Sequence, residues 1–319
     1  MSFQKFGVIT IIAVYLLIFV GGVVRSTGSG MGCPDWPKCF GKWVPPTNID
    51  QLPLNYQEIY GAKLKGEVVF NPVKTWIEYL NRLLGALIGL FVFGTFLLSI
   101  KFSKTDKSIT LWSATAVLLT GIQGWIGSKV VSSELATYMV SIHMIIAIVI
   151  VSILIFVLFK SNFLKNNNTK LAQNGNKKLI WSVFIVTLLQ VLLGTQVREK
   201  IDIVAKLLGE GLRNNWVENV GFMFIVHRSF SIIVLLLHIA LFSHIRKITE
   251  KDSIIWKINN WLVLIILFEI LTGVTLNYLG FPAFIQPLHL TLATISLGIQ
   301  SLLIFEFYSK NEIKTSFTK

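Results

Sequence analysis

Eight long runs of apolar residues, separated by short polar or charged segments, dominate the hydropathy pattern of this chain. The runs cover residues 7–25, 76–100, 109–131, 137–160, 178–197, 221–245, 258–279 and 283–308. A helix needs about 20 mostly apolar residues to cross the hydrocarbon core of a bilayer, and each run has about that length. The pattern therefore predicts an all-α polytopic membrane protein with eight transmembrane helices.

Short motifs recur in the same order in the two halves of the chain, each at a matching place in its run. The first and fifth runs end in GGVVR and GTQVR, and the second and sixth begin with Asn-Arg and His-Arg. The third and seventh contain LTG, and the fourth and eighth place a histidine near their start. The matched residues are Gly21 and Gly194, Asn81 and His227, Gly121 and Gly273, and His143 and His289. We interpret this order as an internal duplication.

The duplication predicts two tandem four-helix bundles, an N-terminal one at residues 1–160 and a C-terminal one at residues 178–319. Residues 161–177 are polar and rich in asparagine, so we expect them to form a flexible cytoplasmic linker. Because each half contains an even number of spans, both halves keep the same orientation and form parallel repeats. The outer loop 26–75 belongs to the N-terminal bundle in this scheme.

The formal net charge of +13 suggests a nucleic-acid partner, but the placement of the basic residues argues against one. With the N-terminus inside, the inner segments hold 16 Lys and Arg against 4 acids, whereas the outer side holds 11 against 9. An excess of Lys and Arg in the inner loops sets the orientation of a membrane protein. We therefore expect a cell (inner) membrane protein with both termini cytoplasmic, in contact with membrane lipid and without a nucleic-acid partner.

The two cysteines of the chain, Cys33 and Cys39, both fall in the first outer loop. That loop faces the oxidising side of the membrane, where a cysteine pair favours a disulfide. A redox-active dithiol and metal ligation are the alternatives. Since no other cysteine exists, zinc or iron–sulfur sites rich in cysteine are excluded within one chain.

Three of the five histidines lie one to two turns into helices that enter from the outer face, at His143, His227 and His289. His227 and His289 belong to facing helices of the second bundle, where two imidazoles can ligate a haem from both sides. Hydrogen bonding to polar neighbours is the alternative, and a zinc or copper site lacks an evident third ligand. His238 has no partner histidine at its depth, and we expect it to be structural.

In the first half His143 faces Asn81 instead of a second histidine. An amide is a poor ligand of haem iron, so a haem held by His143 would keep one axial position open. Glu78 lies three residues before Asn81 on the same helix face, where its carboxylate could relay protons or stabilise a cationic intermediate. The alternative is an interfacial glutamate paired with Arg25 or Lys74.

Two arginines directly follow the predicted ligand positions, Arg82 after Asn81 and Arg228 after His227. A guanidinium pairs well with a carboxylate, so both residues are candidates for binding haem propionates. Glu269 also lies in a predicted span, and the sequence gives it no role.

These residues resemble the haem A synthase family, membrane enzymes of cytochrome oxidase assembly. The resemblance rests on the stretch GGVVRSTGSGMGCPDWPKCFGKWVPP (Gly21–Pro46) and the Glu-x-x-x-Arg segment of the second run. His143, the His-Arg pair at 227–228 and His289 complete it. It covers nearly the whole chain, including the duplicated plan of eight spans.

The resemblance implies that the chain oxidises a ring methyl group of haem O to a formyl group by successive hydroxylations, giving haem A. It implies a haem b cofactor ligated by His227 and His289, and haem O as substrate in the N-terminal half. The substrate-site residues of the family map onto Glu78, Asn81 and His143. Asn81 is a departure, because the common pattern has histidine there.

The resemblance also matches Cys33 and Cys39 to the variety of the family with a cysteine pair in the first outer loop. It adds a haem O synthase, an electron donor and a second copy of the chain as candidate partners. The alternative function is a non-catalytic membrane cytochrome b that carries electrons. A transporter with buried arginines is a third hypothesis.

Overall fold

The computed structural model describes residues 2–61, 69–161, 176–251 and 253–317, and eight of its helices are long and apolar enough to cross a membrane. They are α1 (Phe3–Ser26), α3 (Pro72–Ser99), α4 (Lys107–Ser132), α5 (Thr137–Lys160), α6 (Lys177–Leu208), α7 (Phe222–Ile248), α8 (Ile254–Tyr278) and α9 (Ile285–Phe317). Each falls on one of the predicted runs, which confirms the prediction of an all-α polytopic membrane protein.

The starts of several helices are fixed by polar N-cap side chains that accept a hydrogen bond from the first turn. Such a cap satisfies a backbone N–H that has no partner within the helix. The capping residues are Ser2, Asn71, Asp106, Asn176 and Ser253. In α3 the cap is followed by Pro72, whose ring suits the first helical position.

Helix α6 continues 11 residues beyond the predicted end at residue 197 and closes at Gly209, whose φ of +72° suits glycine. The prediction stopped at the charged residues after Val197. An apolar side of the helix persists, however, because Val197, Ile201 and Val204 are buried against Trp216. The extension is therefore an amphipathic outer segment of the same helix.

The chain divides into two compact units, residues 1–150 and 151–319. Within the first unit α1 packs against α3, and α3 against α4. Hydroxyl groups join the first of these pairs, since Thr10 Oγ1 lies 2.9 Å from Thr95 Oγ1. Most of the predicted linker, residues 162–175, lies outside the described residues.

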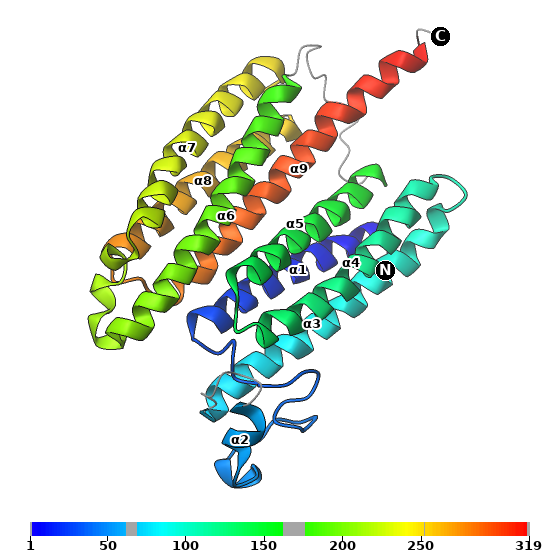
Figure 1. The fold of residues 1–319 in the computed structure, drawn as a ribbon. Helices are drawn as coiled ribbons and strands as arrows, with labels where there is room; N and C mark the ends of the chain where they lie inside the picture. The colour runs from blue at the N-terminus through cyan, green and yellow to red at the C-terminus, as the bar shows by residue number, and fades with distance from the viewer. Residues whose placement is uncertain (1, 62–68, 162–175, 252, 318–319) are drawn as a thin grey trace. The chain divides into compact units, whose positions relative to one another are not determined.

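Within the second unit, helices α6, α7, α8 and α9 pack side by side (Figure 1). The contacts run α6 to α7, α7 to α8, α8 to α9 and α9 to α6, which closes a four-helix bundle. The core of that bundle, near one end, consists of Ile180, Val183, Leu241, Ile245, Ile255, Leu262, Leu303, Ile304 and Phe307. Aliphatic side chains from all four helices thus fix their packing.

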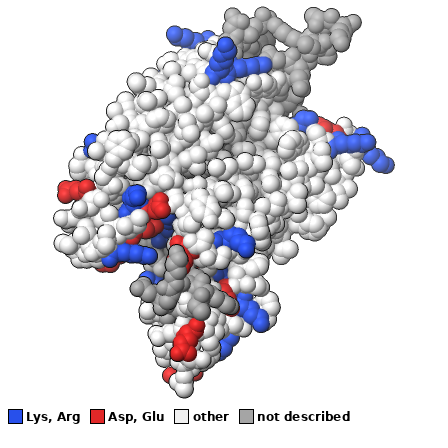
Figure 2. Space-filling model, in the orientation of Figure 1, with Lys and Arg blue, Asp and Glu red and all other residues white. Residues whose placement is uncertain are grey.

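The sides of the helices carry large apolar residues that face outward, among them Ile12, Leu90, Leu118 and Leu236. On the face shown in Figure 2, charged side chains gather near helix ends and loops, whereas the helix sides are largely without them. Apolar surface of this extent needs a nonaqueous environment or a partner. Together with the lengths of the helices, it identifies a multi-pass membrane protein.

Candidate functional site

Each of the three histidines predicted to be ligands packs against a glycine of a neighbouring helix. A β-carbon on Gly194 of α6 would lie 3.3 Å from Cε1 of His227. The equivalent distance is 3.6 Å between Gly273 of α8 and His289, and 3.5 Å between Gly127 of α4 and His143. The absence of a side chain at these positions lets the imidazole rings lie close to the helix backbone.

The glycine contact corrects one match of the predicted duplication. The LTG motifs pair Gly121 with Gly273, but a β-carbon on Gly121 would meet nothing within 4 Å. Gly127 takes the place of Gly273, since each lies 16 residues before its histidine. A match of three common residues is weak, whereas the length of a helical hairpin fixes which residues face each other.

In the second unit the two histidines predicted to ligate haem b lie on α7 and α9 of one four-helix bundle. Each ring packs against a glycine of a neighbouring helix, His227 against Gly194 and His289 against Gly273. The Nδ1 atom of His289 lies 2.8 Å from Thr272 Oγ1 and 3.4 Å from Glu269 Oε2, whereas Nε2 has no hydrogen bond in the described part of the chain. Nδ1 of His227 is buried without a hydrogen-bond partner among the described residues.

These observations test whether the residues fit a haem. A haem iron with two axial imidazoles needs two neutral histidines on facing helices, each with one nitrogen free of other partners. His227 and His289 come from α7 and α9 of one bundle, and no hydrogen bond to Nε2 of either ring is found in the described part of the chain. The donor set therefore fits the group.

The first unit holds one imidazole and one amide with unsatisfied atoms. Nδ1 of His143 and Oδ1 of Asn81 are both buried and lack hydrogen-bond partners within the described part of the chain. A buried polar atom without a partner is costly. Each of these two atoms is therefore a candidate for contact with a ligand.

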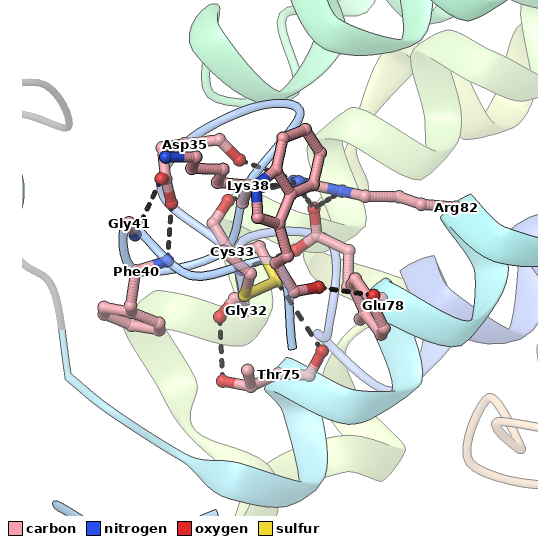
Figure 3. The surroundings of a disulfide bond; sticks show 12 residues. Gly32, Cys33, Asp35, Lys38, Phe40, Gly41, Thr75, Glu78 and Arg82 are labelled. Atoms are coloured by element: carbon pink, nitrogen blue, oxygen red, sulfur yellow. Dashed lines mark hydrogen bonds and ion pairs between the residues drawn. A yellow bond between two sulfur atoms is a disulfide. The ribbon is translucent and has the colours of Figure 1, made fainter. Parts of the chain in front are cut away.

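Glu78 is 3% exposed and uses both carboxylate oxygens in contacts near the start of α3 (Figure 3). Oε2 accepts a hydrogen bond of 2.8 Å from the backbone N–H of Cys33. Oε1 accepts one of 3.1 Å from Nε of Arg82 and a second from Nη2 of the same side chain. The partner of Glu78 is thus Arg82, four residues further along the helix, which the sequence interpretation did not name as its partner.

With its remaining N–H groups, Arg82 holds the outer-loop segment that contains Cys33 and Cys39 (Figure 3). Nη1 donates to the carbonyl oxygens of Asp35 at 2.7 Å and Lys38 at 3.1 Å, and Nη2 donates to that of Cys33 at 3.1 Å. A guanidinium has five N–H donors, and the loop and Glu78 engage all of them. In this arrangement the protein engages every donor of Arg82, so binding of a haem propionate by Arg82, expected from the sequence, would require the exchange of one of these bonds.

The loop itself is closed by a disulfide between Cys33 and Cys39, which confirms the predicted pairing. Both cysteines are fully buried, in a cluster with Phe40, Leu52, Tyr56 and Tyr60. The loop backbone presses on α3 at Gly32, where a β-carbon would lie 2.5 Å from the Lys74 carbonyl oxygen. This burial favours a structural role for the disulfide.

Arg228 and His238, two further residues considered in the sequence analysis, have defined contacts. Arg228 is exposed, and its guanidinium stacks over the ring of Phe224, with 5.6 Å between Cζ and the ring centroid. His238 is buried, with Nδ1 2.7 Å from the carbonyl oxygen of Val234 and Nε2 3.1 Å from the side-chain amide nitrogen of Gln300. Such a satisfied network is what a structural histidine requires.

A polar residue lies four positions before each glycine that packs against a histidine, a pattern that the sequence interpretation missed although it noted Glu269 in its span. The residues are Gln123 before Gly127, Gln190 before Gly194 and Glu269 before Gly273. The amide of Gln190 donates to the His227 carbonyl oxygen at 3.0 Å, and that of Gln123 to the His143 carbonyl oxygen at 2.9 Å. The signal in the sequence is a polar residue one helical turn before a glycine inside an apolar span.

Comparison with known proteins gives a family match over most of the chain. A model of the cytochrome oxidase assembly protein family matches residues 4–301. A Bartonella bacilliformis protein named "Heme A synthase" is 30% identical over 68% of this chain and 68% of its own length. Proteins of the same name from Shewanella oneidensis and Halalkalibacterium halodurans are 26% and 22% identical, over 67% and 92% of this chain and 62% and 93% of their own lengths.

Proposed function

The chain belongs to the cytochrome oxidase assembly protein family, and on that premise we propose that it is a haem A synthase. The reaction oxidises one ring methyl group of haem O to a formyl group. Two successive hydroxylations give a geminal diol, which loses water to leave the aldehyde of haem A. The substrate is haem O and the product is haem A for cytochrome oxidase.

We propose that the second unit binds a resident haem b through His227 and His289. The observation that supports this assignment is that both histidines belong to one four-helix bundle and that neither Nε2 has a hydrogen bond in the described part of the chain. A haem with two axial imidazoles is coordinatively saturated, so it supplies electron transfer. Arg228, which is exposed and bears no acidic partner that the structure describes, is the candidate for a propionate of this haem.

We propose that the first unit takes the substrate haem, with His143 as its one protein ligand. Asn81 offers only an amide, and its buried Oδ1 lacks a partner in the described ranges. The axial position on that side is thereby left free for the oxidising chemistry. This difference between the two units is what separates a catalytic site from an electron-transfer site.

Glu78 is the candidate catalytic carboxylate of the first unit, since it is buried one helical turn before Asn81. Its two oxygens are held by Cys33 and Arg82, which fix the orientation of the carboxylate. A role in proton transfer requires that one of these contacts be exchanged for the substrate or for water. Glu78 therefore links the disulfide loop to the proposed substrate site.

We propose that the protein lies in the cell (inner) membrane with both termini cytoplasmic and the disulfide loop outside. The distribution of basic residues supports that orientation. The proposed reaction is a net oxidation of the methyl carbon, so each hydroxylation needs an oxidant that also supplies oxygen, such as dioxygen, together with an electron donor. It also needs a source of haem O, for which a haem O synthase is the candidate partner. A second copy of the chain is a further candidate partner.

The test is the haem composition of cells that make haem O, with and without this protein. A haem A synthase converts part of the haem O pool to haem A, detected by chromatography of extracted haems. A membrane cytochrome b that only carries electrons leaves the haem types unchanged, and a transporter yields a colourless purified protein. Either of these results would contradict the proposed activity.

A further inference from the structure

The side chains of Gln123 and Gln190 contact the backbone of a histidine, whereas the side chain of Glu269 contacts a histidine ring. The amides of Gln123 and Gln190 donate hydrogen bonds to backbone carbonyl oxygens, those of His143 and His227. A glutamate carboxylate cannot donate such a bond, and Glu269 instead lies beside the ring of His289, with Oε2 3.4 Å from Nδ1. Of these three residues, the only acid, Glu269, is the one whose side chain contacts an imidazole ring.

Thr272 lies between Glu269 and His289 and completes the contact. Its hydroxyl is 2.8 Å from Nδ1 of His289 and also donates to the backbone carbonyl oxygen of Glu269 at 3.0 Å. Glu269 and Thr272 are three residues apart, so both side chains project from one side of α8. Nδ1 of His289 thus faces two oxygen atoms of α8, Oγ1 of Thr272 and Oε2 of Glu269.

The first helix of the chain provides an internal comparison. Gly21 occupies the place of Gly194 in the predicted duplication, yet the residue four positions before it is Leu17. In that half the position of His227 is taken by Asn81. The polar residue is absent where the histidine is absent, which supports a link between the two.

We propose that Glu269 is a positioning residue that, with Thr272, fixes Nδ1 of His289 and so aims Nε2 at the haem iron. The inference rests on the proposed haem b site. Histidines that ligate metals commonly give their other nitrogen to a carboxylate or another oxygen, which fixes the ring and raises its basicity. Glu269 and Thr272 provide both kinds of oxygen.

The proposal makes the two axial ligands unequal. Nδ1 of His227 is buried with no hydrogen-bond partner in the residues that the structure covers, whereas that of His289 faces a carboxylate. A hydrogen bond between Nδ1 and the Thr272 hydroxyl, with the carboxyl group of Glu269 3.4 Å away, makes the imidazole a stronger electron donor to the iron. The stronger donor stabilises ferric over ferrous haem, so Glu269 lowers the reduction potential of the site.

The experiment compares the purified full-length holoprotein with Glu269→Gln and Thr272→Val variants. Thr275→Val is the matched control, because Thr275 lies three residues further on, is half-buried, and in the described part of the chain its hydroxyl bonds to its own helix at Leu271. The readouts are haem content, the ferric electron paramagnetic resonance spectrum and the midpoint potential from a redox titration. None of these depends on turnover of haem O.

Glu269→Gln is expected to retain haem with two imidazole ligands while shifting the ferric–ferrous equilibrium about tenfold toward ferrous, or about 59 mV for one electron. Thr272→Val is expected to shift it in the same direction by less, and Thr275→Val not at all. A potential and a resonance spectrum equal to wild type in both test variants would overturn the role of Glu269 alone. Wild-type protein without a bis-imidazole haem would instead overturn the proposed site, and the inference with it.

Discussion

Glu78 near the start of α3 accepts a hydrogen bond of 2.8 Å from the backbone N–H of Cys33, a residue of the disulfide loop 45 positions earlier in the chain. Both groups are buried, and Arg82 joins them by bonding to the carboxylate of one and the carbonyl oxygen of the other. The loop is therefore attached to the helix that carries the proposed substrate-site residues. A change at Glu78 will affect both the loop and the site.

Replacing Glu78 by alanine is predicted to stop haem A formation while leaving the second haem in place. The variant should accumulate haem O or its hydroxymethyl intermediate, because the proposed catalytic carboxylate is gone. It should also lose about 3 kcal/mol of stability, since Arg82 is left as a buried charge without its partner. Chromatography of extracted haems checks the first effect and thermal unfolding checks the second.

Two companion variants separate these effects. Glu78→Gln keeps the shape of the side chain and an acceptor for Cys33, so it should unfold later than Glu78→Ala while remaining inactive. Arg82→Lys removes most bonds to the loop carbonyls but leaves the carboxylate, so it should accelerate proteolysis in the loop. A normal yield of haem A from either Glu78 variant would remove this residue from the mechanism.

Replacing Asn81 by histidine is predicted to supply the axial ligand that the first unit lacks. The proposed substrate haem would then have two imidazole ligands, and a second low-spin signal should appear in the ferric resonance spectrum. Turnover should fall, because the open axial position is closed. Asn81→Gln is the control, since it keeps an amide and should add no such signal.

An unchanged spectrum in the Asn81→His protein, with folding and haem content intact, would mean that residue 81 does not face a haem. The assignment of the substrate site to the first unit would then lose its main support.

Replacing Cys33 and Cys39 together by serine is predicted to destabilise the outer loop by about 2 kcal/mol, because the closed ring is short. The fully buried cluster around the two sulfur atoms would also loosen. Proteolysis of the loop in native membranes should be faster than in wild type. Loss of haem A formation in a loop that stays protected would instead favour a redox-active dithiol.

Tyr60 of α2 (Tyr56–Gly61) packs in the buried cluster around Cys33 and Cys39, and its phenol is predicted to lose its proton at a higher pH than an exposed tyrosine. Burial, and to a smaller extent the Asp35 carboxylate, raises the pKa of Tyr60 above its ordinary value. The folded loop thus keeps the phenol proton, so this stabilisation is fully present below about pH 10 and is lost as the pH rises further. Ultraviolet difference titration of wild type against Tyr60→Phe measures that midpoint, and an ordinary value would contradict the packing.

The sequence was sufficient for the eight membrane-spanning helices. Apolar runs longer than a bilayer is thick can only be helices that cross it, so the eight elements were predictable. The outer end of α6 was not, because a hydropathy pattern stops at Arg198 while the amphipathic pattern of Ile201 and Val204 continues. Tertiary packing against Trp216 explains that difference.

The contacts of the buried charged residues could not be predicted from the sequence. Glu78 and Arg82 are one turn apart, yet nothing local shows that both turn toward a loop 45 residues away. Glu269 was likewise an unexplained acid in a span until α8 and α9 were placed side by side. Spacing along one helix predicts which residues share a face, but the element opposite that face depends on the whole fold.

The account depends most directly on one pair of ligands, and the ferric resonance spectrum of purified protein tests it. We predict one low-spin bis-imidazole signal that disappears in His227→Ala and in His289→Ala but persists in His143→Ala. A signal that survives both of the first two substitutions, or one that requires His143, would contradict the division of the chain into an electron-transfer site and a substrate site.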